Sequence, residues 1–147
     1  MTILAAVGEK QHWDPVVATA CDLATAYDDE LVVLHVVPTS EFEAHLTSIR
    51  AIPEFADYSL TQEEESAANF AKRVARLTLD EGDEERVRPM GRVGDPVDEI
   101  LDATETLDAR YLVIGHHPRS PTSKALFGST TQSVLLNASV PVVTVRE

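Results

Sequence analysis

Five short apolar runs alternate along the chain with segments whose apolar residues recur at helical spacing. The run at 111–114, Tyr-Leu-Val-Ile, has no polar alternation, which is typical of a strand buried on both faces. Strands that alternate with helices form a parallel sheet covered by helices on both faces. The sequence therefore predicts a doubly wound α/β fold, with strands at residues 2–7, 30–37, 86–93, 111–114 and 140–145.

Two of the predicted strands contain a proline, which has no backbone N–H to donate to a sheet. Pro89 interrupts the third run together with Arg88, and Pro141 lies near the start of the fifth run. Both strands are therefore expected at sheet edges. A chain of 147 residues has the size of one ordinary domain, so a single domain over residues 1–147 is expected.

Three helix starts are indicated by residues that satisfy free N–H groups. Asp14-Pro15 and Asp95-Pro96 each place a capping aspartate before a proline in the first turn. Thr61 and Glu64 have the spacing of a capping box, which predicts the start of a long helix.

Apolar residues at helical spacing predict which side chains face the core. The expected inward residues are Val16, Val17, Ala20, Leu23, Ala24 and Tyr27 in the first helix, and Ala67, Phe70, Ala71, Val74 and Leu77 or Thr78 in the helix after Thr61. Gly82 is placed in an acidic turn beyond that helix. Cys21 is interpreted as a small core side chain, and His35 as a satisfied histidine of a strand. Residues 38–60 are predicted to form a mobile flap or a short helix.

The formal net charge of −13 argues against nucleic acid as a partner, because a phosphate backbone is bound by clustered lysine and arginine. The chain has only three lysines, and its acids fall in runs that look solvated. Such a surface resembles proteins of salt-accumulating microbes, in which molar salt screens the repulsion. We therefore expect stability to rise with added KCl.

No apolar run is long enough to cross a bilayer, and the chain enters its first strand without a charged and then apolar leader. A cytoplasmic protein without a membrane partner is therefore expected.

The segment from Tyr111 to Thr131 reads as a strand, a polar loop and a helix start. Gly115 is expected to end the strand with a sharp turn and a close approach of another group. Gly128-Ser129 opens the next helix, whose first N–H groups lack intrahelical partners. Ser129, Thr130 and Thr131 could hold an anion such as phosphate there. An ordinary connection in which Ser129 only caps the helix is equally compatible with the pattern.

This segment resembles the universal stress proteins of the nucleotide-binding kind. Their motif is Gly-x-x-Gly, nine residues, and then Gly followed by Ser or Thr. The chain has Gly115-His116-His117-Pro118, nine residues, and Gly128-Ser129, with Pro118 in the place of the second glycine. The similarity extends over the whole chain, through residues 34–36 to the last run at 140–145.

The resemblance implies a five-stranded parallel sheet in the order 3-2-1-4-5, with a ligand crevice where the order reverses between the first and fourth strands. It implies an adenine nucleotide, ATP or AMP, with or without Mg²⁺, in a regulatory role in the stress response, and a homodimer through the C-terminal strand. The residues implied at the adenosine are Ala6, Val7, Gly8, Val36 and Ile114. Those implied at the phosphates are Gly115, His117, Gly128, Ser129, Thr130 and Thr131.

The sequence departs from the family pattern at two positions. Gly8 stands where the family usually has an aspartate that accepts hydrogen bonds from the nucleoside, and its loss is expected to cost about 1–3 kcal/mol of affinity. Pro118 has no N–H to offer a phosphate. Lys124 and Arg119 could add positive charge or could lie in solvent.

The same residues also bear on metal binding and catalysis. His116 and His117 are adjacent in a loop and no cysteine or carboxylate cluster completes a metal set, so no metal is expected. Ser129 and His117 have no nucleophile elbow around them, and no Walker-type lysine motif is present, so no fast reaction is expected; slow ATP hydrolysis stays open. The alternative function is a nucleotide-free dimeric interaction or signalling protein that engages a protein client.

Overall fold

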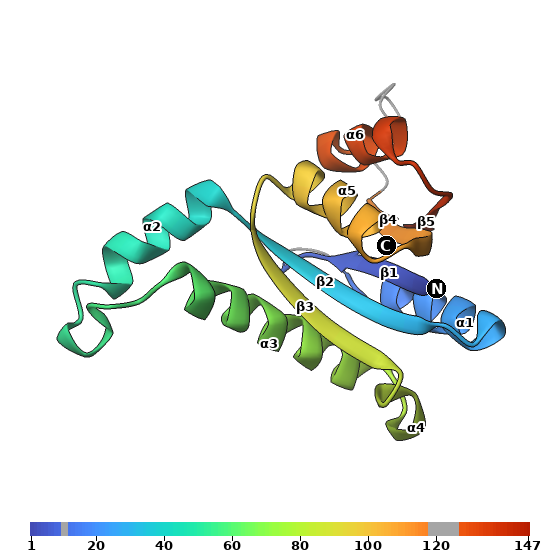
Figure 1. The fold of residues 1–147 in the computed structure, drawn as a ribbon, viewed down its shortest axis with the longest axis horizontal. Helices are drawn as coiled ribbons and strands as arrows, with labels where there is room; N and C mark the ends of the chain where they lie inside the picture. Colours follow the sequence, from blue (N-terminus) through green and yellow to red (C-terminus); the bar gives the residue numbers. More distant parts are fainter. Residues whose placement is uncertain (10–11, 118–126) are drawn as a thin grey trace.

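The protein forms one five-stranded sheet in the computed structural model, which describes residues 1–9, 12–117 and 127–147 (Figure 1). The strand order is β3-β2-β1-β4-β5, and each pair of neighbours is parallel. The strands are β1 (Thr2–Val7), β2 (Glu30–Pro38), β3 (Val87–Gly94), β4 (Ala109–His116) and β5 (Val142–Arg146). The helices are α1 (Asp14–Tyr27), α2 (Thr39–Ile49), η1 (Pro53–Phe55, a 3-10 turn), α3 (Leu60–Thr78), α4 (Glu81–Glu84), α5 (Pro96–Thr106) and α6 (Ser129–Asn137). The predicted fold class and strand order are confirmed.

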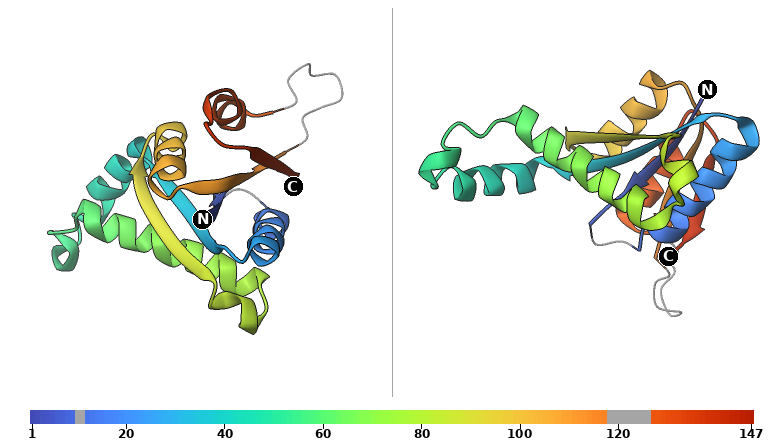
Figure 2. Two further views of the ribbon diagram at one scale, coloured as in Figure 1. Left: turned by 45° about the vertical axis from the view of Figure 1, so that its right-hand side comes forward. Right: turned by 90° about the horizontal axis from the view of Figure 1, so that it is seen from below.

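Helices cover both faces of the sheet, with α1 and α3 on one side and α5 and α6 on the other (Figure 2). The alternation of side chains along β1 divides the core accordingly, because successive residues of a strand point to opposite faces. Ile3 and Ala5 pack with α1 and α3, and Leu4 packs with α5 and α6. Each half of the core is thus a separate apolar cluster, and Cys21 is buried in the first, as predicted.

The third and fifth strands lie at the two edges, as predicted. Pro89 is inside β3, but β5 starts at Val142, so Pro141 precedes the strand and removes no donor from it. The Pro141 carbonyl instead accepts a hydrogen bond from the Leu112 amide at 3.1 Å.

The helix starts agree only in part with the sequence. Asp95 caps α5 by accepting a hydrogen bond from the Asp98 amide at 3.1 Å. Asp14 does not cap α1: it is the first helical residue, and its carboxylate accepts a hydrogen bond from the Thr78 hydroxyl at 3.1 Å. The capping box of α3 is formed by Ser59 and Gln62, so the prediction of Thr61 and Glu64 was wrong by two residues.

Three residue placements also differ from expectation. Leu77 is 71% exposed, so of the alternatives Leu77 and Thr78 only Thr78 is half-buried. Tyr27 is 44% exposed, and it is the last residue of its helix. Ala75 is buried on the α3 stripe in place of Leu77. Gly82 lies within the short helix α4 rather than in a turn.

The segment 38–60 contains α2 and η1, so the short-helix interpretation is the correct one. The helix α2 extends beyond the sheet and has no buried residue (Figure 1). Its contact with α3 centres on Glu63, a carboxylate that is only 6% exposed. The Tyr58 hydroxyl donates a hydrogen bond to Glu63 Oε2 at 2.6 Å, and His45 Nδ1 lies 2.9 Å from the same oxygen. We call α2 and η1 the arm.

In the described parts of the chain, every helix is too short or too polar to cross a lipid bilayer.

Candidate functional site

A cavity of about 370 Å³ lies at the carboxyl ends of β1, β2 and β4. This is the point where the strand order reverses, since β1 pairs with β2 on one side and with β4 on the other. In doubly wound sheets, the crevice at this point is the usual place for a ligand. The lining residues are Ala6, Val7, Gly8, Glu9, Leu34, His35, Val36, Pro38, Glu41, Pro96, Ile100, Ile114, Gly115, Thr130, Thr131 and Val134.

The floor of the cavity is apolar and belongs to the α5 and α6 side of the sheet. It is formed by even-numbered strand residues, which point to this face, and by side chains of α5 and α6. These residues are Ala6, Leu34, Val36, Ile114, Ile100 and Val134. A planar apolar group such as a nucleobase fits a floor of this kind.

The first turn of α6 forms one end of the cavity. Thr130 and Thr131 line it, and the Thr131 hydroxyl donates a hydrogen bond to the Gly115 carbonyl at 3.2 Å. Gly128 occupies the N-cap position, and no side chain caps this helix among the residues described. Ser129 is the first helical residue, so the interpretation in which Ser129 caps the helix is wrong. The end of α6 therefore presents main-chain N–H groups and hydroxyls, a combination that suits an anion.

The opposite end of the cavity contains Glu9, Glu41 and His35. The ring of His35 is buried against Phe70, with ring centroids 4.5 Å apart. His35 Nδ1 lies 2.9 Å from the Val7 carbonyl oxygen, and because a carbonyl only accepts, Nδ1 donates that hydrogen bond. The prediction of a satisfied strand histidine is confirmed.

Gly115 does not end its strand, because β4 continues to His116 and Gly115 pairs with Val145 of β5. No described glycine has a positive φ, so no sharp turn is made at Gly115. The expected close approach is present: a Cβ at Gly115 would collide with the carboxylate of Glu147. Because Gly115 has no side chain, the Glu147 carboxylate can pack against it. Gly115 also lines the cavity, through its main chain.

The structure brings together most of the residues predicted for the site. Those that line the cavity are Ala6, Val7, Gly8, Val36, Ile114, Gly115, Thr130 and Thr131. Three others, His117, Gly128 and Ser129, do not line it. Pro118, Arg119 and Lys124 lie outside the described residues.

Sequence reasoning missed the remaining lining residues, which are Glu9, Leu34, His35, Pro38, Glu41, Pro96, Ile100 and Val134. The alternation along β2 was a usable signal for Leu34, which shares its face with Val36. Glu41 gave no local signal, because its position depends on how α2 leaves the sheet.

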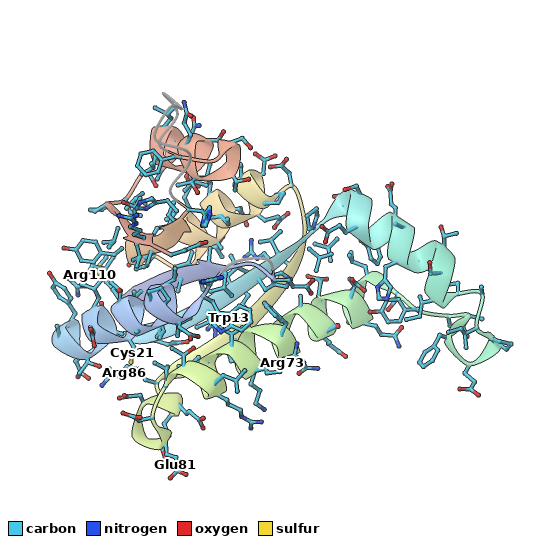
Figure 3. All side chains as sticks on the ribbon, turned by 180° about the vertical axis from the view of Figure 1, so that it is seen from behind. Trp13, Cys21, Arg73, Glu81, Arg86 and Arg110 are labelled. Atoms are coloured by element: carbon cyan, nitrogen blue, oxygen red, sulfur yellow. The ribbon has the colours of Figure 1, made fainter. Side chains whose placement is uncertain are left out.

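A second, more polar cavity of about 420 Å³ lies between α2, α3 and the end of β2. Its lining includes Glu63 and His45 from the arm contact and Arg73 of α3, which Figure 3 labels. Glu9, His35 and Glu41 line both cavities. The two cavities therefore meet at these residues. The first cavity lies on the α5 and α6 side, and the second on the α3 side.

Positive side chains of the described chain are largely remote from the first cavity. Arg86 and Arg110 lie at the end of the molecule opposite the arm (Figure 3). Arg110 Nε donates a hydrogen bond to Asp29 at 2.7 Å, which lowers the pKa of that carboxyl. In the part of the chain that the structure describes, the first cavity is lined by carboxylates but by no lysine or arginine.

No group of three or more His, Cys, Asp or Glu residues could hold a metal ion within residues 1–9, 12–117 and 127–147. His117 and Ser129, the histidine and serine weighed for catalysis, share no hydrogen bond in the described chain.

Comparison with known proteins identifies relatives over the full length. The sequence profile of the Universal stress protein family matches residues 1–146. The chain is 32% identical to universal stress protein G of Shigella flexneri over 82% of this chain and 81% of that protein. A structure of the universal stress protein from Archaeoglobus fulgidus in complex with dAMP is 20% identical, with a TM-score of 0.60 over 98% of this chain and 96% of that one. A universal stress protein in complex with cAMP is 17% identical, with a TM-score of 0.63 over 99% and 96% of the two chains.

Proposed function

The chain belongs to the universal stress protein family, and we propose that it is a single-domain member that binds an adenine nucleotide in a regulatory role. The observation that supports this most directly is the cavity at the switch point, with an apolar floor and the uncapped start of α6 at one end. Two proteins of the same fold hold dAMP and cAMP, which are adenine nucleotides.

In this proposal the base lies on the apolar floor, next to Ala6, Val7, Gly8, Val36 and Ile114. The phosphate lies at α6, where Thr130 and Thr131 line the cavity and Gly128 and Ser129 form the helix start. His117 follows β4 on the same side and is assigned to the mouth of the site, and Gly115 contributes its main chain. The base would thus be buried against apolar side chains, and the phosphate would accept hydrogen bonds from the start of α6.

The proposed ligand is ATP or AMP. The carboxylates of Glu9 and Glu41 at the cavity repel added phosphate charge, so ATP would bind as its Mg²⁺ complex. The role is that of a regulatory ligand in a cytoplasmic stress response, without a fast chemical step.

Isothermal titration with ATP and AMP in molar KCl tests this function. We expect saturable heat with the parent protein and none with Gly128→Val, because the added side chain fills the space where the phosphate meets α6. No described atom lies within 4 Å of a Cβ at Gly128, so the fold should be kept. Gly82→Val is the matched control, since Gly82 also has open space around it and is remote from the cavity.

The absence of heat with the parent at millimolar nucleotide would remove the proposal. A Gly128→Val variant that binds as tightly as the parent would instead show that the phosphate site has been assigned to the wrong residues.

The arm favours a second candidate, a nucleotide-free interaction protein that engages a client. The helix α2 buries no residue. Beyond it, Ile52 before η1, Phe55 in η1 and Leu60 at the start of α3 are 46%, 44% and 49% exposed. Exposed apolar side chains grouped in this way are typical of interaction surfaces. Titrations without heat, together with an intact fold, would favour this function over the first.

We also propose a two-fold homodimer in which the β5 strands of two copies pair antiparallel. In the described chain β5 is an edge strand with β4 as its one neighbour, and an unpaired edge tends to be covered. Light scattering at micromolar concentration should give twice the mass of 16.1 kDa, and a monomer would contradict the dimer.

A further inference from the structure

The two cavities meet at a pair of carboxylates whose role the nucleotide proposal leaves open. Glu9 follows β1 and Glu41 lies in the first turn of α2, directly after β2. Both line the apolar cavity and the polar cavity. They therefore lie where the two cavities meet, at the carboxyl ends of the strands.

The carboxylate of Glu41 makes no hydrogen bond and no ion pair with another described residue. Glu9 has one long approach, 3.9 Å from its Oε1 to His35 Nε2. An ionised carboxylate only accepts hydrogen bonds. The ring of His35 packs on Phe70 of α3, on the face of the sheet opposite the apolar floor. The carboxylates of Glu9 and Glu41 are thus the hydrogen-bond acceptors at this end of the cavity.

The acceptors and the anion-binding end lie on opposite sides of β1. Glu41 follows β2, whereas Thr130 and Thr131 belong to α6, which follows β4, and β1 separates β2 from β4 in the sheet. A nucleotide whose phosphate meets α6 therefore extends its nucleoside towards Glu9 and Glu41.

We infer that Glu41, assisted by Glu9, accepts a hydrogen bond from the nucleoside of the bound nucleotide and makes the site selective for nucleosides with a donor at that position. This inference rests on the proposed nucleotide function. The donor is either the exocyclic amine of adenine or a ribose hydroxyl. Glu41 is exposed at the mouth of the cavity, so a nucleoside that presents a keto oxygen, or that lacks the hydroxyl, forgoes this hydrogen bond and binds more weakly.

The selectivity arises from hydrogen bonding rather than from net charge. Replacing Glu41 by glutamine removes a negative charge and so strengthens the binding of every phosphate ligand. This common effect cancels in the ratio of two affinities. Only a direct contact changes the ratio, because the amide of glutamine can donate as well as accept.

The experiment is a titration of the full chain with AMP, IMP and 2′-deoxy-AMP in molar KCl, for the parent and for Glu41→Gln. We expect the parent to bind AMP at least about tenfold more tightly than one of the two analogues, which corresponds to one good hydrogen bond. In Glu41→Gln that preference should fall by at least about threefold. A lower AMP/IMP ratio identifies the base amine as the donor, and a lower AMP/deoxy-AMP ratio identifies the ribose.

Glu43→Gln is the matched control, because Glu43 lies exposed on the same helix and lines neither cavity. It should leave both ratios as in the parent. The inference is overturned if Glu41→Gln binds AMP and keeps both ratios of the parent, a result that leaves the nucleotide function standing. A parent that binds none of the three nucleotides overturns both.

Discussion

At the scale of single residues, the contact between the arm and the body depends on a buried carboxylate. Glu63 Oε2 receives the Tyr58 hydroxyl at 2.6 Å and lies 2.9 Å from His45 Nδ1. Arg50 holds the same region by donating two hydrogen bonds to the Tyr58 carbonyl. A buried ionised group that loses such a partner is costly, so each of these bonds matters more than its average strength suggests.

Tyr58→Phe should therefore destabilise the protein by about 1–3 kcal/mol at pH 8, because Glu63 keeps its burial and loses a donor. Urea unfolding measures this. Tyr27→Phe is the control, since the Tyr27 hydroxyl is exposed and lies 3.3 Å from its partner Tyr111. That change should stay within about 0.5 kcal/mol. Equal midpoints for Tyr58→Phe and the parent would contradict the proposed importance of this bond.

The same hydroxyl gives the protein a dependence on alkaline pH. Burial and then the neighbouring Glu63 raise the pKa of Tyr58 from 10.0 to about 12. The native state thus holds the phenol proton more firmly than the unfolded chain does. This contribution to stability is complete below pH 10 and is lost as the pH rises towards 12. In Tyr58→Phe the fall in stability over this interval should be smaller.

How much of the site could be predicted depends on the kind of residue. Ala6, Val36 and Ile114 were implied by the family resemblance, and the parallel pairing of β1 with β2 and β4 explains why these strand ends lie together. Glu41 could not be predicted, because its contribution depends on the direction in which α2 leaves the sheet. For His117, Gly128 and Ser129 the prediction went further than the cavity does. The spacing of the motif places them near the ligand, but they do not line the cavity.

At the scale of elements, the packing of β3 on α3 depends on one glycine. A Cβ at Gly91 would collide with the main chain of Glu64 and Ala68, and it would lie 2.7 Å from the Cβ of Ala67. Neither main-chain atom can move without displacing the helix. The edge strand therefore approaches α3 as closely as it does only because this position has no side chain.

Gly91→Ala should destabilise the protein by about 1–3 kcal/mol or more through overpacking. Gly82→Ala provides the comparison, because Gly82 lies in α4 with nothing within 4 Å of the added methyl. That variant should be neutral or more stable by up to about 1 kcal/mol, since alanine has less freedom in the unfolded chain. Thermal unfolding of both variants tests the pair, and an unchanged Gly91→Ala would show that β3 can shift at no cost.

Strands were easier to predict than the exact starts of helices. All five strands were expected. Pro89 lies inside the edge strand β3, whereas Pro141 precedes β5, so the second edge was predicted correctly but for a reason that the structure does not bear out. Helix starts were less certain because two capping boxes overlap: Ser59 with Gln62 and Thr61 with Glu64. The structure uses the earlier one, in which the Gln62 side chain accepts a hydrogen bond from the Ser59 amide at 2.8 Å. Sequence gives no reason to prefer either box.

At the scale of the whole molecule, the formal net charge of −13 opposes compaction. In 1 M salt the Debye length shrinks to about 3 Å, so repulsion between separated surface acids is screened. Short ion pairs such as Arg110 with Asp29, in which the aspartate is buried, are screened much less.

The melting temperature should therefore rise between dilute buffer and molar KCl. Calorimetry at a series of KCl concentrations measures the change, and an equal osmolarity of a neutral solute is the control for excluded-volume effects. A melting temperature that is flat or falls with KCl would contradict a salt-adapted surface.

The burial of Cys21 has a practical consequence for following the arm in solution. Its thiol is 5% exposed and its pKa is raised by burial, so it should react slowly with maleimide reagents. The parent protein should therefore be labelled very little by thiol reagents. A cysteine introduced at the exposed Ile52 would become the one fast-reacting position, and a fluorophore there would report a client that binds at the arm.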